Sequence, residues 1–105
     1  MPDAGAVDFD QLAWEAPAPG LRTKTVDRGG KKLRLVEFSA DFVEPDWCVR
    51  GHAGLVLQGE IEGEGAGAVV RFRTGEGLFI AAGDSHRHRH HATIAAARLF
   101  LVEDL

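Results

Sequence analysis

Four of the chain's five histidines lie in one run, residues 83–91, in which histidine and arginine alternate. If this run is a β-strand, its two-residue period sorts the side chains onto two faces. One face then carries His86, His88 and His90, and the other carries Arg87, Arg89 and His91. Arginine is rarely buried without a partner, so we expect the arginine face in solvent and the histidine face inside. Inward imidazoles would form a titratable lining able to bind a metal ion, and we expect function there.

The spacing along such a strand limits how many of these histidines can share one ion. Same-face neighbours lie roughly 6.5 to 7 Å apart and can converge on one ion, whereas His86 and His90 would be about 13 Å apart. At most two of the three can therefore bind the same ion. The others would line a pocket, either as hydrogen-bonding groups or as acid and base groups near neutral pH.

Short apolar runs separated by turns predict the elements that hold these residues. Thirteen glycines and four prolines divide the chain, and no helical spacing of apolar residues persists, so we expect an all-β fold. About eight strands are expected, over residues 23–27, 32–39, 42–49, 52–61, 68–74, 78–81, 86–93 and 96–103. The two glycines after Arg28 predict a hairpin turn between the first two strands. Such a set of strands suits a closed barrel or a two-sheet jelly roll.

The expected strand over residues 52–61 does not sort its side chains cleanly. An inward His52 would also turn Val56 inward, but it would send Ile61 to the opposite face. We therefore expect one of two arrangements. Either a bulge near residues 58–59 shifts the alternation, or the outer face is covered by a neighbouring strand or a partner subunit.

Composition limits the class of protein and its partners. The chain has 105 residues and a formal net charge of −4, which predicts a single domain over residues 11–105 after a mobile segment, residues 1–10. Its basic residues are scattered among acidic ones, so we expect no nucleic-acid partner. No apolar run is long enough for a membrane span, and the first residues lack the basic and apolar pattern of a secretory signal, so we expect neither. The lone Cys48 cannot form an internal disulfide, which favours a reducing cytoplasm.

Two stretches resemble the conserved motifs of a known family. Residues 51–61, which read GHAGLVLQGEI, resemble the middle of the first motif of the cupins, and residues 77–86, GLFIAAGDSH, resemble the second. Cupins are small jelly-roll β-barrels, and the resemblance covers about residues 46–91. It therefore implies a cupin barrel, and it implies a homodimer, which the apolar outer face of the expected strand 52–61 also favours. No residue pattern fixes the dimer interface.

The resemblance also implies a set of metal ligands. Metal-binding cupins usually supply two histidines and a glutamate from the first motif and one histidine from the second. These positions fall here on Asp46, Cys48, His52 and His86. Only His86 matches the family's usual residue, yet each replacement can bind metal. One oxygen, one sulfur and two nitrogen donors suit zinc best, with iron, nickel or copper as alternatives.

The remaining candidates belong to the wall of a pocket. We assign His88 and His90 to its lining and Trp47 to an aromatic part of its wall. The first functional reading is a metal-binding cupin whose cavity holds a small polar molecule, with turnover left open. The second is a metal-free, non-catalytic module that binds an anion or a sugar-like ligand through its histidines. A third is a structural barrel that acts through dimerisation.

Overall fold

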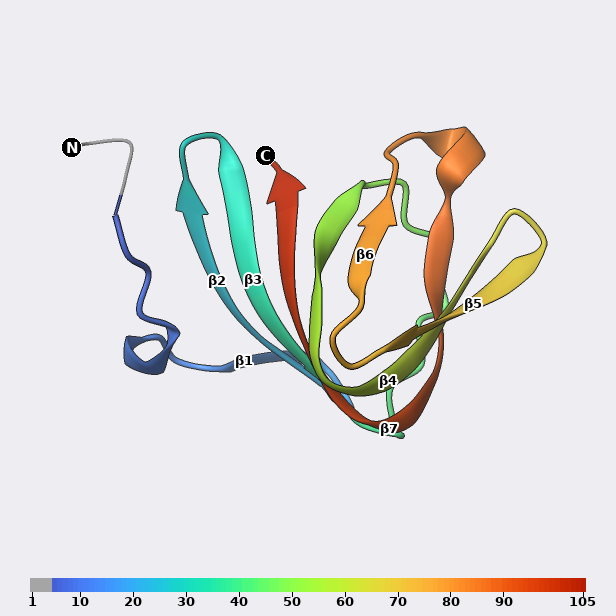
Figure 1. The fold of residues 1–105 in the computed structure, drawn as a ribbon, viewed down its shortest axis with the longest axis horizontal. Helices are drawn as coiled ribbons and strands as arrows, with labels where there is room; N and C mark the ends of the chain where they lie inside the picture. Colours follow the sequence, from blue (N-terminus) through green and yellow to red (C-terminus); the bar gives the residue numbers. More distant parts are fainter. Residues whose placement is uncertain (1–4) are drawn as a thin grey trace.

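The chain folds into an antiparallel β-structure in the computed structural model, which describes residues 5–105. Its seven strands and two short 3-10 helices are η1 (Phe9–Gln11), β1 (Glu15–Ala18), β2 (Leu21–Arg28), β3 (Lys31–Phe38), β4 (His52–Gly65), β5 (Ala68–Arg73), β6 (Gly77–Ile80), η2 (Asp84–His86) and β7 (His88–Asp104). The strands pair in the order β1-β2-β3-β7-β4-β5, and β6 pairs with β4. Figure 1 shows that β4 and β7 are long and strongly bent, so that each runs from one side of the fold to the other. The predicted all-β jelly-roll barrel is confirmed.

Two glycines form the turn between β2 and β3. Gly29 and Gly30 have φ angles of +54° and +78°, which residues with a side chain rarely adopt. Two consecutive positive φ angles are typical of a two-residue hairpin turn, and Arg28 pairs with Lys31 across it. The predicted hairpin is confirmed.

The long strand β4 changes the face that it presents to the interior. Val56 is 1% exposed and Ile61 is 6% exposed, although a regular strand would place residues five positions apart on opposite faces. The pairing of β4 with β7 shifts register between these two residues, and Gly59 within the shift has a φ of +78°. A bulge, one of the two arrangements expected for this segment, is therefore present. It allows both His52 and Ile61 to face the interior.

The predicted strand over residues 42–49 is wrong. These residues belong to a connection between β3 and β4, residues 39–51, that we call the strap. Pro45 lacks the amide hydrogen that a strand interior requires. Within the strap only Cys48 makes a β-bridge, and its partner is His88.

The histidine run enters β7 later than predicted. Asp84–His86 forms the helix η2, and β7 begins only at His88. From there β7 continues as one strand of 17 residues, where two strands were predicted, because no glycine or proline interrupts it. The alternation expected for the histidines therefore begins only at His88, and register shifts in the pairing with β4 change the buried face farther along, to Ala97, Leu99 and Leu101.

The core lies on the inner faces of β3, β4, β6 and β7. Its buried residues are Val36, Val56, Ile61, Leu78, Ala97, Leu99 and Leu101. Before β1, the ring of Phe9 packs edge-on against Phe100, with centroids 6.0 Å apart. The mobility expected for residues 1–10 stays a prediction, and residues 1–4 lie outside the described part of the chain. No helix among the described residues is long and apolar enough to span a membrane.

Candidate metal centre

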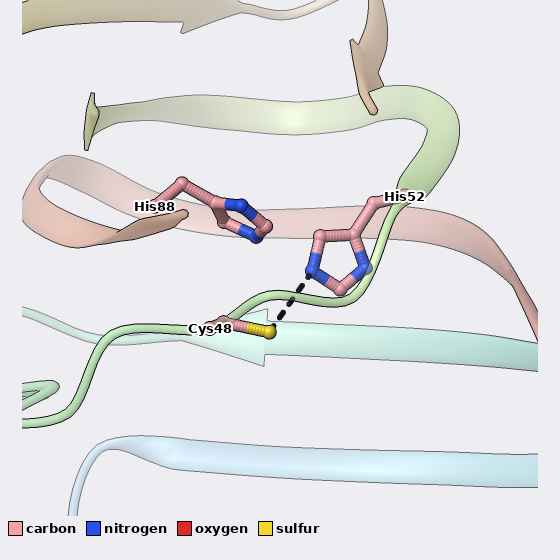
Figure 2. A group of neighbouring side chains, drawn as sticks. All are labelled: Cys48, His52 and His88. Atoms are coloured by element: carbon pink, nitrogen blue, oxygen red, sulfur yellow. Dashed lines mark hydrogen bonds between the residues drawn. The ribbon is translucent and has the colours of Figure 1, made fainter. Parts of the chain in front are cut away.

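Three side chains from separate segments converge on one point inside the barrel. Cys48 comes from the strap, His52 begins β4 and His88 begins β7 (Figure 2). One donor atom from each residue can be chosen so that all three atoms lie within 4.8 Å of one another. Cys48 Sγ lies 3.9 Å from His52 Nε2, and the two imidazole rings meet edge to face with centroids 4.8 Å apart. A sulfur and two imidazole nitrogens thus share one small space.

Backbone pairing brings two of these residues together. The amide of Cys48 donates to the carbonyl oxygen of His88 at 2.7 Å, and the amide of His88 donates back to Cys48 at 2.9 Å. The two residues therefore lie directly opposite each other, as in an antiparallel ladder. His52 reaches them from β4, where it pairs with Ile80 of β6.

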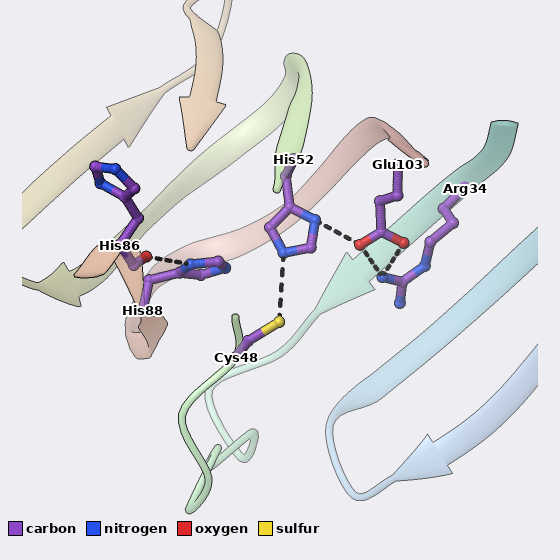
Figure 3. Close-up of polar contacts among 6 residues, drawn as sticks. All are labelled: Arg34, Cys48, His52, His86, His88 and Glu103. Atoms are coloured by element: carbon purple, nitrogen blue, oxygen red, sulfur yellow. Dashed lines mark hydrogen bonds and ion pairs between the residues drawn. The ribbon is translucent and has the colours of Figure 1, made fainter. Parts of the chain in front are cut away.

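A buried ion pair lies behind His52. Glu103 Oε2 is 2.5 Å from His52 Nδ1, although the two atoms are not aligned as a regular hydrogen bond. Arg34 Nη1 lies 3.2 and 3.3 Å from the two carboxylate oxygens of Glu103 (Figure 3). The Glu103 side chain is only 3% exposed, so this contact takes place away from solvent. With Nδ1 facing the carboxylate, the Nε2 atom of His52 faces Cys48, which is the usual arrangement of a metal-binding histidine and its carboxylate partner.

The protonation of Glu103 follows from these neighbours. Burial alone would raise the pKa of its carboxyl, but contact with His52 and the positive charge of Arg34 outweigh burial. They hold the pKa of Glu103 below its usual value, so the group is a carboxylate near neutral pH.

His88 presents a free nitrogen to the same space. Its Nδ1 lies 3.2 Å from the carbonyl oxygen of His86, and a hydrogen on Nδ1 would leave a lone pair on Nε2. Nε2 is buried and has no hydrogen-bond partner among the described residues. Burial lowers the pKa of His88, which favours the neutral imidazole that binds metals.

The other predicted ligands lie outside this group. His86 is exposed in η2, and Asp46 is exposed in the strap. The structure thus brings together two of the four predicted ligands, Cys48 and His52, and adds His88, which had been assigned to the pocket lining. Because η2 occupies the positions before His88, the strand alternation that would have turned His86 inward is absent.

Trp47 and His90 occupy different surroundings. Trp47 is 39% exposed, and the guanidinium of Arg89 lies 4.3 Å from the centre of its ring. His90 lies inside, stacked on Phe38 at 4.5 Å between ring centroids and edge-on to Phe42 at 5.0 Å. Burial lowers the pKa of His90 to about 4, so this ring is neutral near pH 7.

A pocket of about 730 Å³ adjoins the three donors. Its polar lining includes Cys48, His52, His88, His90, Arg34 and Glu103. The apolar part of its wall includes Val36, Phe38 and Leu99, which belong to the core or pack against it. An apolar wall with a few convergent polar groups is typical of a small-molecule site.

Sequence reasoning missed Arg34 and Glu103. A signal for Glu103 was present, because it follows Leu99 and Leu101 at two-residue intervals and so shares their buried face. A carboxylate on an apolar strand face needs a partner, which predicts a neighbour such as Arg34 or a histidine.

Comparisons with known proteins find similarity in structure alone. No protein-family model matches the chain, and no curated protein matches it. KdgF from Halomonas sp. is similar with a TM-score of 0.74 over 90% of this chain and 89% of that one, at 20% identity. An RmlC-like cupin from Shewanella frigidimarina gives 0.73 over 99% and 94%, at 15% identity. FeII HppE gives 0.68 over 98% of this chain and 65% of that one, at 16% identity.

Proposed function

Since the chain has the β-barrel fold of the cupin superfamily, we propose that it is a metal-binding cupin whose pocket takes a small polar molecule. Cys48, His52 and His88 would hold the ion. The observation that carries the proposal is the convergence of their three donor atoms within 4.8 Å, from three separate segments. The proposal concerns binding and does not require turnover.

The donor set fits a transition metal. Thiolate and imidazole are soft or borderline ligands, which favours zinc, with iron, nickel and copper as alternatives. His88 Nε2 has no other partner in the described structure, and Glu103 holds the ring of His52 from behind. The FeII HppE structure has the same fold and, by its name, contains ferrous iron. Three protein ligands leave a position that water or a bound molecule could fill, where the ion would act as a Lewis acid.

The residues around the ion suggest what the pocket accepts. His90 is neutral near pH 7 and stacks on Phe38, so this wall offers an aromatic surface and not a positive charge. A molecule with a hydroxyl or carbonyl group for the ion and a compact apolar part for this wall would match both features.

A second candidate function is the metal-free binding of a small molecule. His88 Nε2 and His90 Nδ1 are both buried side-chain nitrogens without a hydrogen-bond partner in the described structure. Leaving such atoms unpaired is costly, and a hydrogen-bonding ligand could satisfy them.

The test is the metal content of protein purified without a tag, followed by reconstitution of the metal-free protein with Co²⁺. A cobalt–thiolate bond absorbs strongly in the near ultraviolet and so reports Cys48 directly. We expect near-stoichiometric binding in the wild type, its loss in His88→Ala and Cys48→Ser, and its retention in His86→Ala. His91→Ala is the matched control, since it removes an exposed histidine from the same strand.

Two outcomes would contradict the proposal. No metal in the purified wild type, together with no binding of Co²⁺ on reconstitution, would favour the metal-free function. Loss of binding in His86→Ala together with its retention in His88→Ala would restore the ligand set implied by the sequence resemblance.

A further inference from the structure

The strap covers an edge that the sheet leaves open. β3 pairs with β7 only from Ala97 onward. The beginning of β7 therefore pairs with β4 on one side and has no strand of the described chain on the other. On the open side the amide of His90 donates to Glu44 Oε2 of the strap at 2.6 Å. A side chain thus takes the place of a neighbouring strand, and the strap depends on such contacts to stay in position.

Arg89 ties three segments together at this edge. Its Nε atom donates to Glu64 Oε1 of β4 at 2.5 Å, and its Nη1 atom donates to the carbonyl oxygen of Pro45 in the strap at 3.2 Å. Its guanidinium also lies 4.3 Å from the centre of the Trp47 ring. The Arg89 side chain is 31% exposed and that of Glu64 is 25% exposed, so both are shielded in part from solvent.

These contacts act on the residues just before Cys48. Arg89 fixes Pro45 and Trp47, while the backbone bridge to His88 fixes Cys48 itself. Without the arginine, the strap would be held on this side of Cys48 through Glu44, which accepts from the amide of His90, and through the Phe42 ring, which packs on Phe38 and His90.

We propose that Arg89 is a positioning residue for the metal centre, which it serves by clamping the strap so that Cys48 faces His52 and His88. The inference rests on the proposed function, because it assigns Cys48 to a metal site. Arginine suits the task, since its planar guanidinium can stack on an indole while two of its nitrogens donate in different directions. Lysine has no such plane.

The first experiment measures the reactivity of the thiol in metal-free protein with an aromatic disulfide reagent. Cys48 is the only cysteine in the chain, so the signal belongs to one residue. We expect the reaction to be at least about tenfold faster in Arg89→Ala than in the wild type, because local opening of the strap exposes the thiol. Arg71→Ala is the matched control, since Arg71 is 42% exposed and also faces two glutamates, Glu60 and Glu62, without reaching the strap.

The second experiment titrates the same proteins with Co²⁺. We expect Arg89→Ala to bind about 10- to 100-fold more weakly and to lose the thiolate absorption. Arg71→Ala should match the wild type. Trp47→Phe, which keeps an aromatic surface for the guanidinium, should retain the absorption, whereas Trp47→Ala should weaken it. A purely structural role for Arg89 would lower stability without this specific loss of the sulfur signal.

Wild-type reactivity and a wild-type cobalt spectrum in Arg89→Ala would overturn the inference. If the wild type itself binds no cobalt, the proposed function fails, while the thiol reaction still decides whether Arg89 positions Cys48. If Arg89→Ala does not fold, as judged by circular dichroism, Arg89→Lys decides the question in the same two assays, because lysine loses the planar group that stacks on the indole and donates twice. Trp47→Ala, which removes the ring that both Arg87 and Arg89 face, is measured beside it.

Discussion

Acid should weaken the fold through His90, well before the carboxylates titrate. Burial between Phe38 and Phe42 lowers the pKa of His90 from 6.5 to about 4. The unfolded chain therefore binds a proton at a higher pH than the folded chain does. The stability that His90 contributes is present above pH 6.5 and is lost as the pH falls toward 4.

The size of the effect follows from the two pKa values. A lowering from 6.5 to about 4 corresponds to about 3 kcal/mol in the free energy of unfolding when it is complete. Between pH 7 and pH 5 the same linkage predicts a loss of about 2 kcal/mol. Stopping at pH 5 stays above the range in which Glu37 and Glu103, whose pKa values are lowered, take up protons.

Urea unfolding of metal-free protein at pH 7 and pH 5 would measure this loss. His90→Phe keeps an aromatic ring against Phe38 but cannot titrate, so we expect it to lose about 2 kcal/mol less than the wild type over this interval. His88, whose pKa is also lowered by burial, is present in both proteins and cancels in the comparison. Equal pH dependence in the two proteins would refute the reasoning, because it would mean that the folded chain tolerates a charged His90.

Three further predictions concern the metal centre and the bulge. Glu103→Gln should weaken zinc binding about 10- to 100-fold, because His52 loses the negative charge that holds its ring. Calorimetric titration measures the affinity, and an unchanged value would mean that Glu103 does not contribute to the site. Zinc at about 100 times its dissociation constant should raise the free energy of unfolding by about 2.7 kcal/mol. This gain should vanish in Cys48→Ser, and an equal gain in the wild type and the variant would mean that the ion binds elsewhere. Gly59→Ala should destabilise the fold by at least about 2 kcal/mol. Gly59 has a φ of +78°, and a new Cβ would lie 2.2 Å from the carbonyl oxygen of Ala96. A free energy of urea unfolding equal to that of the wild type would contradict this prediction.

The sequence predicted the features that depend on local pattern. Paired glycines after Arg28 indicated a hairpin, and the structure has it. The conflicting faces of Val56 and Ile61 indicated either a bulge or a covered outer face, and the structure shows the bulge. Both signals come from neighbouring residues. The jelly-roll barrel was predicted from the spacing of the strands and from two short motifs that resemble those of the cupins.

The ligand assignments depended on where a strand begins, which pattern alone does not determine. His86 and His88 would lie on the same face of a continuous strand, yet His86 belongs to η2 and His88 begins β7. The difference comes from the bridge between Cys48 and His88, a contact between residues 40 positions apart in the sequence. Glu103 did carry a local signal, because it shares the buried face of Leu99 and Leu101, but its partner His52 lies on another strand and no local pattern joins the two.

The bend of β7 brings residues from both ends of this strand to the candidate metal centre. His88 and Glu103 lie near opposite ends of this strand, and a straight strand would hold them about 50 Å apart. Both nevertheless lie around His52, His88 by ring contact and Glu103 by charge. Binding by all three donors therefore requires a closed barrel, because in an extended chain only Cys48 and His52 lie near each other in sequence.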